Sequence, residues 1–219
     1  FLTLVLSQID KEYLKMMQQY NQLLLQRNKL LKMDSVCWEL VETIDFRMSI
    51  CADYIYKKRC ELCSLLEEKV YSYYAALSSG KETVKLEYIS DLHEGSLDEI
   101  LLKERAKDAL LKFTSRGIHK DDIEFTLNGM PLKKCGSQGQ QKSFLVALKL
   151  AQFDIMKQLH GITPILLLDD VFDKLDMQRV EYLLSLVSGD SFGQIFISDS
   201  NKVRMSGIVD KLTQDRAYY

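Results

Sequence analysis

The chain has 219 residues, enough for one large domain or two small ones, and its 47% hydrophobic and 27% charged residues are ordinary for a soluble globular protein. A net charge of −2 excludes a global basic surface for nucleic acid, so any DNA contact must come from local clusters such as residues 57–59 or 133–134. The sequence has no apolar run of about 18 residues, which excludes a transmembrane helix. Five cysteines without a targeting pattern predict a reducing, intracellular setting in which the thiols are packed or inert.

The first part of the chain has the pattern of two long helices. Apolar residues recur at three- and four-residue steps over residues 7–32 and again over residues 35–79, which predicts one helix in each segment. Asp34 or Ser35 can cap the second helix, and Gly80 is placed to end it because glycine tolerates a left-handed turn. A helix of about 45 residues extends for about 65 Å and cannot fold back within a compact core. The pair therefore predicts an antiparallel hairpin that projects as an arm.

The rest of the chain has shorter elements. Residues 81–89 alternate as a strand, and Ser96 with Glu99 forms a capping box for a helix over residues 97–113. Strand and helix patterns then alternate, in this order: strand 123–127, a tight turn at 128–129, helix 138–160, strand 165–168, helix 176–188, strand 194–198 and helix 203–213. Such an alternation predicts an α/β fold with a parallel sheet.

Two adjacent carboxylates follow the apolar run at residues 165–168. In open α/β sheets, ligands bind at the carboxyl ends of the strands. A buried strand can deliver Asp169 to Mg²⁺, directly or through water, as Walker B strands do. Asp170 points to the other side of the strand and can orient or deprotonate an attacking water. The alternative interpretation is a strand followed by an acidic turn.

A loop with two glycines opens the helix predicted over residues 138–160, and its sequence is Gly136-Ser137-Gln138-Gly139-Gln140-Gln141-Lys142. The glycines let the backbone come close to a ligand, and Ser137 offers a hydroxyl. The free amides and the dipole of the helix start favour a phosphate. The alternative interpretation is a glycine loop with a serine N-cap.

The order of the motifs favours the functional interpretation. The phosphate-ready helix start precedes the Asp169-Asp170 strand by one helix, and residues 172–176, a further helix and a strand ending at residues 197–200 come after it. That order matches the signature motif, Walker B strand, D-loop and switch loop of an ABC-class ATPase head. We therefore predict the C-terminal lobe of such an ABC/SMC-type head over residues 114–219 and a mainly helical arm domain over residues 1–113.

The amino-acid sequences of these motifs resemble those of the RecF family. The resemblance covers nearly the whole chain and lies in residues 7–14, 26–32, 115–122, 137–151 and 168–176. It implies a C-terminal fragment of a DNA replication and repair ATPase. The fragment would carry the second half of the ATP site.

The resemblance also implies roles for particular residues. The set that would bind ATP comprises Ser137, Gln138, Gly139, Gln140, Lys142 and Asp176. Ser137 and Gly139 would contact the γ-phosphate of ATP on the opposite subunit, and Asp176 would be the D-loop aspartate that crosses the dimer interface. Asp169 would serve Mg²⁺, and Asp170 would be the catalytic carboxylate.

Several departures from the ABC pattern shape the expected activity. Asp170 is one methylene shorter than the usual glutamate, which predicts slow hydrolysis suited to a switch. Asp199 stands where many ABC proteins keep a switch histidine, and an aspartate cannot donate a hydrogen bond in the same way. The sequence contains no G-x-x-x-x-G-K-[ST] loop, which is the Walker A element that holds the β- and γ-phosphates. We expect the chain alone to bind ATP weakly or not at all and to be inactive.

For the full-length protein, the resemblance implies an ATP-dependent, homodimerising clamp on double-stranded DNA at gaps or single-strand junctions. It implies RecR and RecO as partners, a bacterial cytoplasmic location at the nucleoid, and no membrane contact. Two alternatives stay open: another SMC-like ATPase, which the short arm disfavours, and a non-catalytic interaction module that kept the fold. An intact Walker A loop upstream would support the enzyme, and a degenerate one would support the module.

Overall fold

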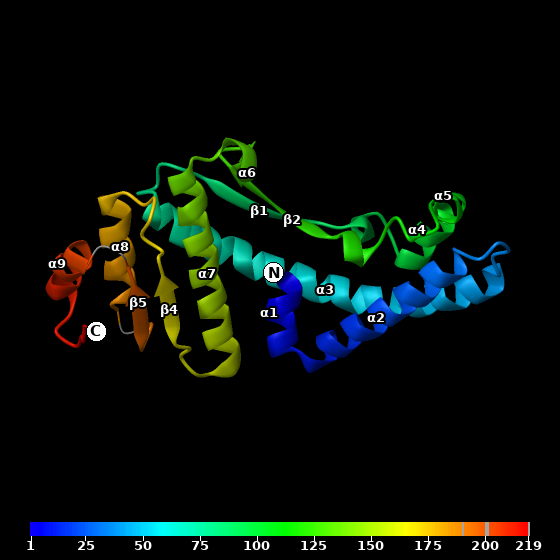
Figure 1. Ribbon diagram of the computed structural model, residues 1–219, viewed down its shortest axis with the longest axis horizontal. Coiled ribbons are helices and arrows are strands. Elements are labelled where there is room, and N and C mark those ends of the chain that lie inside the picture. The colour runs from blue at the N-terminus through cyan, green and yellow to red at the C-terminus, as the bar shows by residue number, and fades with distance from the viewer. Residues whose placement is uncertain (190, 200–201, 219) are drawn as a thin grey trace. The chain divides into compact units, whose positions relative to one another are not determined.

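The computed structural model describes residues 1–189, 191–199 and 202–218. By its internal contacts the chain divides into two compact units, and Figure 1 shows their elements. The first unit comprises Phe1–Ser64 and Glu87–Glu124, and the second comprises Leu65–Leu86 and Phe125–Tyr219. This division by contacts differs from a division at residue 113, because the end of the long helix and the start of the first strand belong to the second unit. Within the described ranges, no helix combines the length and apolar character needed to cross a bilayer.

The first unit contains the helical hairpin. Its helices are α1 (Leu2–Ile9), α2 (Lys11–Leu30), the first part of α3 (Trp38–Leu77), α4 (Leu97–Lys103) and α5 (Arg105–Leu111), with 3-10 turns at Asp91–His93 and Ile118–Lys120. Arg27 of α2 pairs with Asp45 of α3, and Arg59 of α3 donates to Tyr13 of α2. Tyr13, early in α2, contacts Arg59, whereas Arg27, late in α2, contacts Asp45, which lies earlier in α3. The two helices are therefore antiparallel, as predicted.

Two predicted helices are divided in the structure. The helix predicted over residues 7–32 is interrupted at Asp10, whose backbone is extended and whose carboxylate caps α2 by accepting from the Tyr13 amide at 2.9 Å. Aspartate satisfies a free helix amide better at a cap than in a helix interior, so the single-helix prediction was wrong. The helix predicted over residues 97–113 likewise breaks at Glu104, and it ends before Lys112, whose φ of 59° is left-handed. The long second helix is confirmed as α3, with 40 residues.

Buried ion pairs tie the first unit together. The Arg27 guanidinium is fully buried and donates to Asp45 at 2.6 Å, to Asp108 at 2.6 Å and to Thr114 at 2.9 Å. These contacts join α2, α3, α5 and the segment after α5. Burial raises the pKa of Asp45 above its ordinary value, although the hydrogen bond and charge of Arg27 oppose that shift. The hairpin therefore depends on a charged core as well as on its apolar stripe.

The second unit is built around one long helix and a parallel strand pair. Its elements after the end of α3 are α6 (Leu132–Cys135), α7 (Gln138–His160), β4 (Leu166–Asp169), α8 (Met177–Val187), β5 (Ile195–Ser198) and α9 (Lys202–Leu212). Strands β1 (Val84–Ile89), β2 (Asp122–Leu127) and β3 (Met130–Pro131) form a three-stranded sheet in that order. β4 and β5 pair in parallel, from Leu166 beside Ile195 to Asp169 beside Ser198. The predicted strand and helix order is confirmed here.

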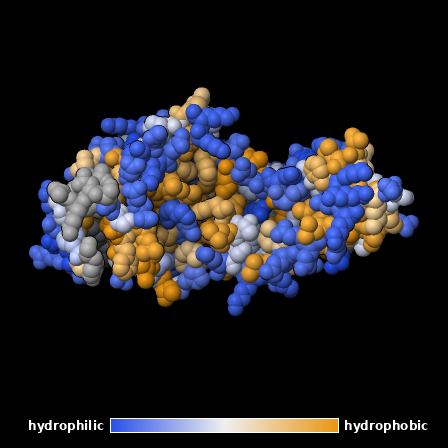
Figure 2. All heavy atoms as spheres, viewed as in Figure 1, coloured by the Kyte–Doolittle hydropathy of each residue, from blue (hydrophilic) through white to orange (hydrophobic). Residues whose placement is uncertain are grey.

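One face of β4 is covered, whereas no residue of β5 is buried on either face. Leu166 and Leu168 are buried, but the alternate side chains are exposed: Ile165 at 59%, Leu167 at 69% and Phe196 at 52%. Figure 2 shows this apolar surface over β4 and β5. The apolar runs at residues 165–168 and 194–198 favour two buried parallel strands, and this interpretation was wrong for the described residues, because β4 is buried on one face only and β5 on neither. Successive strand residues point to opposite faces, and the described helices cover only one of them.

Candidate functional site

Ser137 begins α7 with a reciprocal cap. Its hydroxyl accepts from the Gln140 amide at 3.3 Å, and the Gln140 side-chain oxygen accepts from the Ser137 amide at 2.8 Å. The N-cap interpretation of this serine is correct as a description of the local structure. It does not compete with a ligand role, because a serine hydroxyl can accept one bond and still donate its proton. Ser137 and Gln138 are both exposed at the tip of a helix of 23 residues.

The turn after β4 approaches α7 at Gly139. A Cβ atom on Gly139 would lie 3.0 Å from the backbone carbonyl of Lys174, so only glycine fits there without a shift of the backbone. Lys142, on the next turn of α7, donates from Nζ to the Asp170 carbonyl at 3.1 Å. The first turns of α7 and the end of β4 therefore lie at one edge of the second unit.

The two adjacent carboxylates at the end of β4 are both exposed. Asp169 accepts a hydrogen bond from the Ser198 hydroxyl of β5, and the Asp170 amide donates to the Ser198 carbonyl at 3.2 Å. The φ angle of Asp170 is +48°, in the left-handed region that aspartate and asparagine tolerate better than longer side chains. Aspartate therefore suits the backbone at this position better than a longer acidic side chain does. Asp199 follows β5 and is half-buried, and Ser200 lies outside the described residues.

Asp176 caps the helix after the turn. Its Oδ1 accepts from the Arg179 amide at 2.9 Å, and its Oδ2 lies 3.3 Å from Arg179 Nε. The carboxylate is nevertheless 63% exposed. It can therefore still reach a group outside this unit.

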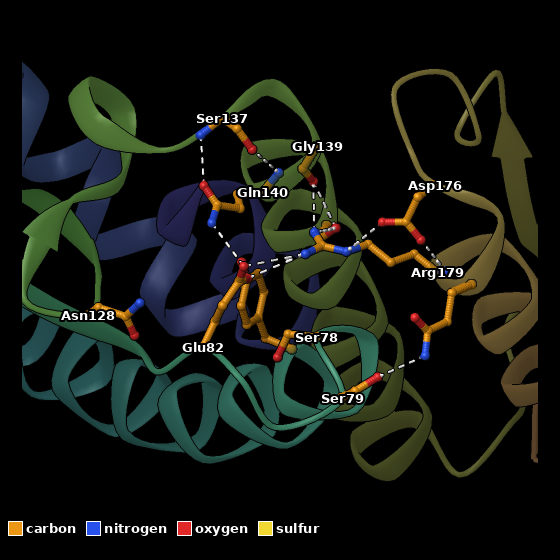
Figure 3. Close-up of polar contacts among 12 residues, drawn as sticks. Ser78, Ser79, Glu82, Asn128, Ser137, Gly139, Gln140, Asp176 and Arg179 are labelled. Atoms are coloured by element: carbon orange, nitrogen blue, oxygen red, sulfur yellow. Dashed lines mark hydrogen bonds and ion pairs between the residues drawn. The ribbon is translucent and has the colours of Figure 1, made fainter.

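Sequence reasoning missed two residues that bind these motifs together, Glu82 and Arg179 (Figure 3). Arg179 lies on the first turn of α8 and contacts Glu82, which precedes β1, at 3.4 Å. Glu82 also accepts from Gln140 at 2.9 Å. Burial tends to raise the pKa of Glu82, but hydrogen bonds from Tyr74 and Gln140 and the charge of Arg179 outweigh it and lower that pKa. The only local signal in the sequence was the spacing of Arg179 three residues after a capping aspartate.

The carboxylates at this edge could supply only part of the ligands that Mg²⁺ needs. Among the described residues, no group of three or more His, Cys, Asp or Glu side chains is arranged to hold a metal ion. Mg²⁺ in nucleotide sites is usually held by one or two carboxylates together with phosphate oxygens and water. Asp169 could be one of these carboxylates. The Ser198 hydroxyl, at the end of β5, donates to Asp169 and orients it.

Comparisons with known proteins identify relatives along the whole chain. The DNA replication and repair protein RecF of Parabacteroides distasonis is 44% identical over 219 residues, which is 100% of this chain and 60% of that protein. The RecF protein of Bacteroides thetaiotaomicron is 44% identical over 216 residues, 98% of this chain and 58% of that protein. No family model matches the chain. The chain thus spans about 60% of the length of these curated relatives.

A solved structure supports the same relationship. The recombination mediator protein RecF-ATPrS in the RecFOR pathway matches with a TM-score of 0.79 and 29% identity, over 93% of this chain and 57% of that chain. Its counterpart RecF-ATP matches with a TM-score of 0.76 and 28% identity, over 91% and 57%. The mixed helix-and-strand fold is therefore that of nucleotide-bound RecF structures. Over nearly its whole length, the chain is therefore similar to one part of the DNA replication and repair protein RecF.

Proposed function

We propose that this chain supplies one half of a composite ATP site in a RecF-type ATPase that dimerises on DNA. The observation that carries the proposal is the contact between Lys142 Nζ and the Asp170 carbonyl at 3.1 Å. It joins a helix start suited to phosphate and a strand end that carries two carboxylates. Exposed, adjacent motifs of this kind fit a ligand that arrives from another lobe or subunit.

The roles follow from the chemistry of each group. Ser137 and Gly139 would donate to the γ-phosphate of ATP bound to the opposite subunit, and the other members of this edge, Gln138, Gln140, Lys142 and Asp176, would line the same interface. Asp169 would hold Mg²⁺, which supplies positive charge between the phosphates when bound. Asp170 would orient and deprotonate the attacking water. A single short carboxylate on a constrained turn supports slow hydrolysis.

Partners are proposed from the relatives. Proteins named for DNA replication and repair, and solved structures named for the RecFOR pathway, support DNA and other proteins of that pathway as partners in general. Within this proposal, the substrate is double-stranded DNA at gaps or single-strand junctions, and the protein partners are RecR and RecO. The assembly would act at the nucleoid of a bacterial cytoplasm. A near-neutral chain, at a net charge of −2, implies that its DNA contacts are local rather than global.

The proposal predicts that the full-length protein dimerises with ATP and Mg²⁺ and that Ser137→Arg prevents it. The bulky cation removes a phosphate donor and blocks the helix tip, so ATP-dependent dimerisation should weaken at least about tenfold. Light scattering after size-exclusion chromatography measures the mass with and without ATP. Lys149→Ala, an exposed change later in the same helix, is the matched control and should dimerise normally.

Two outcomes would contradict the proposal. One is a Ser137→Arg protein that dimerises like the wild type. The other is a wild-type protein whose mass does not respond to ATP while it still binds DNA, which would favour the non-catalytic interaction module.

A further inference from the structure

Glu82 gathers three donors from three segments of the second unit (Figure 3). Tyr74, near the end of α3, donates its hydroxyl to Oε2 at 2.6 Å. Gln140, in the first turn of α7, donates its side-chain amide to Oε1 at 2.9 Å. Arg179, in the first turn of α8, lies 3.4 and 3.5 Å from the two oxygens. Both carboxylate oxygens are thus engaged by groups that no local pattern brings together.

Arg179 uses every guanidinium nitrogen in the same network. Nη1 donates to the Ser143 hydroxyl at 2.7 Å and to the Gly139 carbonyl at 3.4 Å. Nη2 faces Glu82, and Nε lies 3.3 Å from Asp176. The side chains of Arg179 and Glu82 are each only 16% exposed, so water screens this pair less than it screens an exposed pair. The Arg179 guanidinium therefore connects the Asp176 carboxylate to the Gly139 carbonyl in the first turn of α7.

The network also fixes the orientation of the Gln140 amide. Ionised Glu82 can only accept, so the Gln140 nitrogen must face it. The Gln140 oxygen then faces the Ser137 amide, where it completes the cap. A continuous path of ion pairs and hydrogen bonds runs from Asp176 through Arg179, Glu82 and Gln140 to Ser137.

We propose that Glu82 and Arg179 are positioning residues that hold Ser137 and Asp176 in one fixed geometry. The pair forms a polar brace, so that the tip of α7 and the start of α8 meet the partner's nucleotide together. Neither residue touches the phosphate itself. The inference rests on the proposed function and adds the residues that align its two motifs.

The brace predicts a specific kinetic signature in the full-length protein. Glu82→Gln and Arg179→Gln should each lower kcat for ATP hydrolysis roughly 10- to 100-fold, because small misplacements of aligned groups are costly. The Kd for ATP in the undimerised protein should stay within about twofold of the wild-type value, since the brace does not contact the nucleotide. The double variant should be no slower than the worse single variant, because the two residues act through one interaction.

Two further variants separate positioning from stability. Asp154→Asn removes the negative charge that Lys69 faces at 3.5 Å and that accepts from the Tyr73 hydroxyl at 2.7 Å, about 24 Å along α7 from Gln138. This variant should leave kcat unchanged, and its effect on Tm should be similar to that of the Glu82 and Arg179 variants. Tyr74→Phe removes one donor to Glu82 and keeps the ring, and it should lower kcat by a smaller factor. It provides the test even if the Glu82 variants do not fold.

The outcomes distinguish the brace from the composite site. If Ser137→Arg abolishes hydrolysis but the Glu82, Arg179 and Tyr74 variants match Asp154→Asn, the brace is overturned and the proposed function stands. Additive losses in the double variant, or a parallel loss of ATP affinity, also overturn it. If Ser137→Arg has no effect, the proposed function fails and the brace fails with it.

Discussion

Replacing Arg27 with methionine should destabilise the first unit by about 3–5 kcal/mol, because it leaves buried carboxylates without their partner. Arg27 and Asp108 are both fully buried, and Asp45 is nearly so. Methionine fills much of the volume but supplies no charge and no donor. Urea unfolding followed by circular dichroism measures the loss. Lys15→Met, which breaks an exposed pair with Glu12, is the control and should change stability by less than about 1 kcal/mol.

The Arg27→Met deficit should also depend on pH. Burial already raises the folded-state pKa of Asp45 above its ordinary 3.8, and loss of Arg27 removes the charge that opposes this rise. A folded-state pKa above the unfolded one means that the folded state binds more protons, so stability is gained as pH falls toward 3.8. The deficit should therefore be smaller near pH 5 than near pH 7. A deficit that is equal at both pH values would mean that unpaired carboxylates are not its cause.

Asp170→Asn in the full-length protein should lower single-turnover ATP hydrolysis by roughly 100-fold or more, because the amide cannot accept a proton from water. Asparagine suits the left-handed backbone at this position, with its φ of +48°, so the turn itself should be preserved. Asp170→Glu keeps the carboxylate but strains that backbone and moves the charge. It should retain more activity than Asp170→Asn and less stability.

The pair of variants isolates the chemistry of Asp170 from its conformation. Thermal unfolding of both proteins should show Asp170→Asn close to the wild type. Unchanged hydrolysis rates in both variants would remove Asp170 from the mechanism.

The sequence predicted where the candidate site residues lie, but it did not predict the residues that hold them in place. Asp169 and Asp170 were placed at a strand end by an apolar run and two acids, and Ser137 at a helix start by capping chemistry. These are local sequence patterns, and local patterns predict secondary structure without knowledge of the tertiary fold. Glu82 and Arg179, by contrast, meet across 97 positions of sequence, and no local rule pairs a loop glutamate with a helix arginine. The roles of the site residues remain predictions.

The fold shows the same limit. Long periodic segments predicted α7 with the bounds that the structure has, and α3 with small errors at its ends. The break at Asp10 was missed because the apolar spacing continues through it, while the aspartate prefers to cap the next helix. The exposure of Leu167 was missed because a run of apolar residues does not say how many of its faces will be covered.

Mixing two inactive full-length variants tests the composite site most directly. Ser137→Arg keeps Asp170, and Asp170→Asn keeps Ser137, so each variant should be inactive alone. If the pocket is shared between two copies in a twofold dimer, each mixed dimer holds one intact pocket of two, so hydrolysis should rise clearly above the mean of the two separate variants. It should reach about a quarter of the wild-type rate where mixed dimers make up half of all dimers. Activity that stays at the mean of the two separate variants would contradict a pocket shared between subunits.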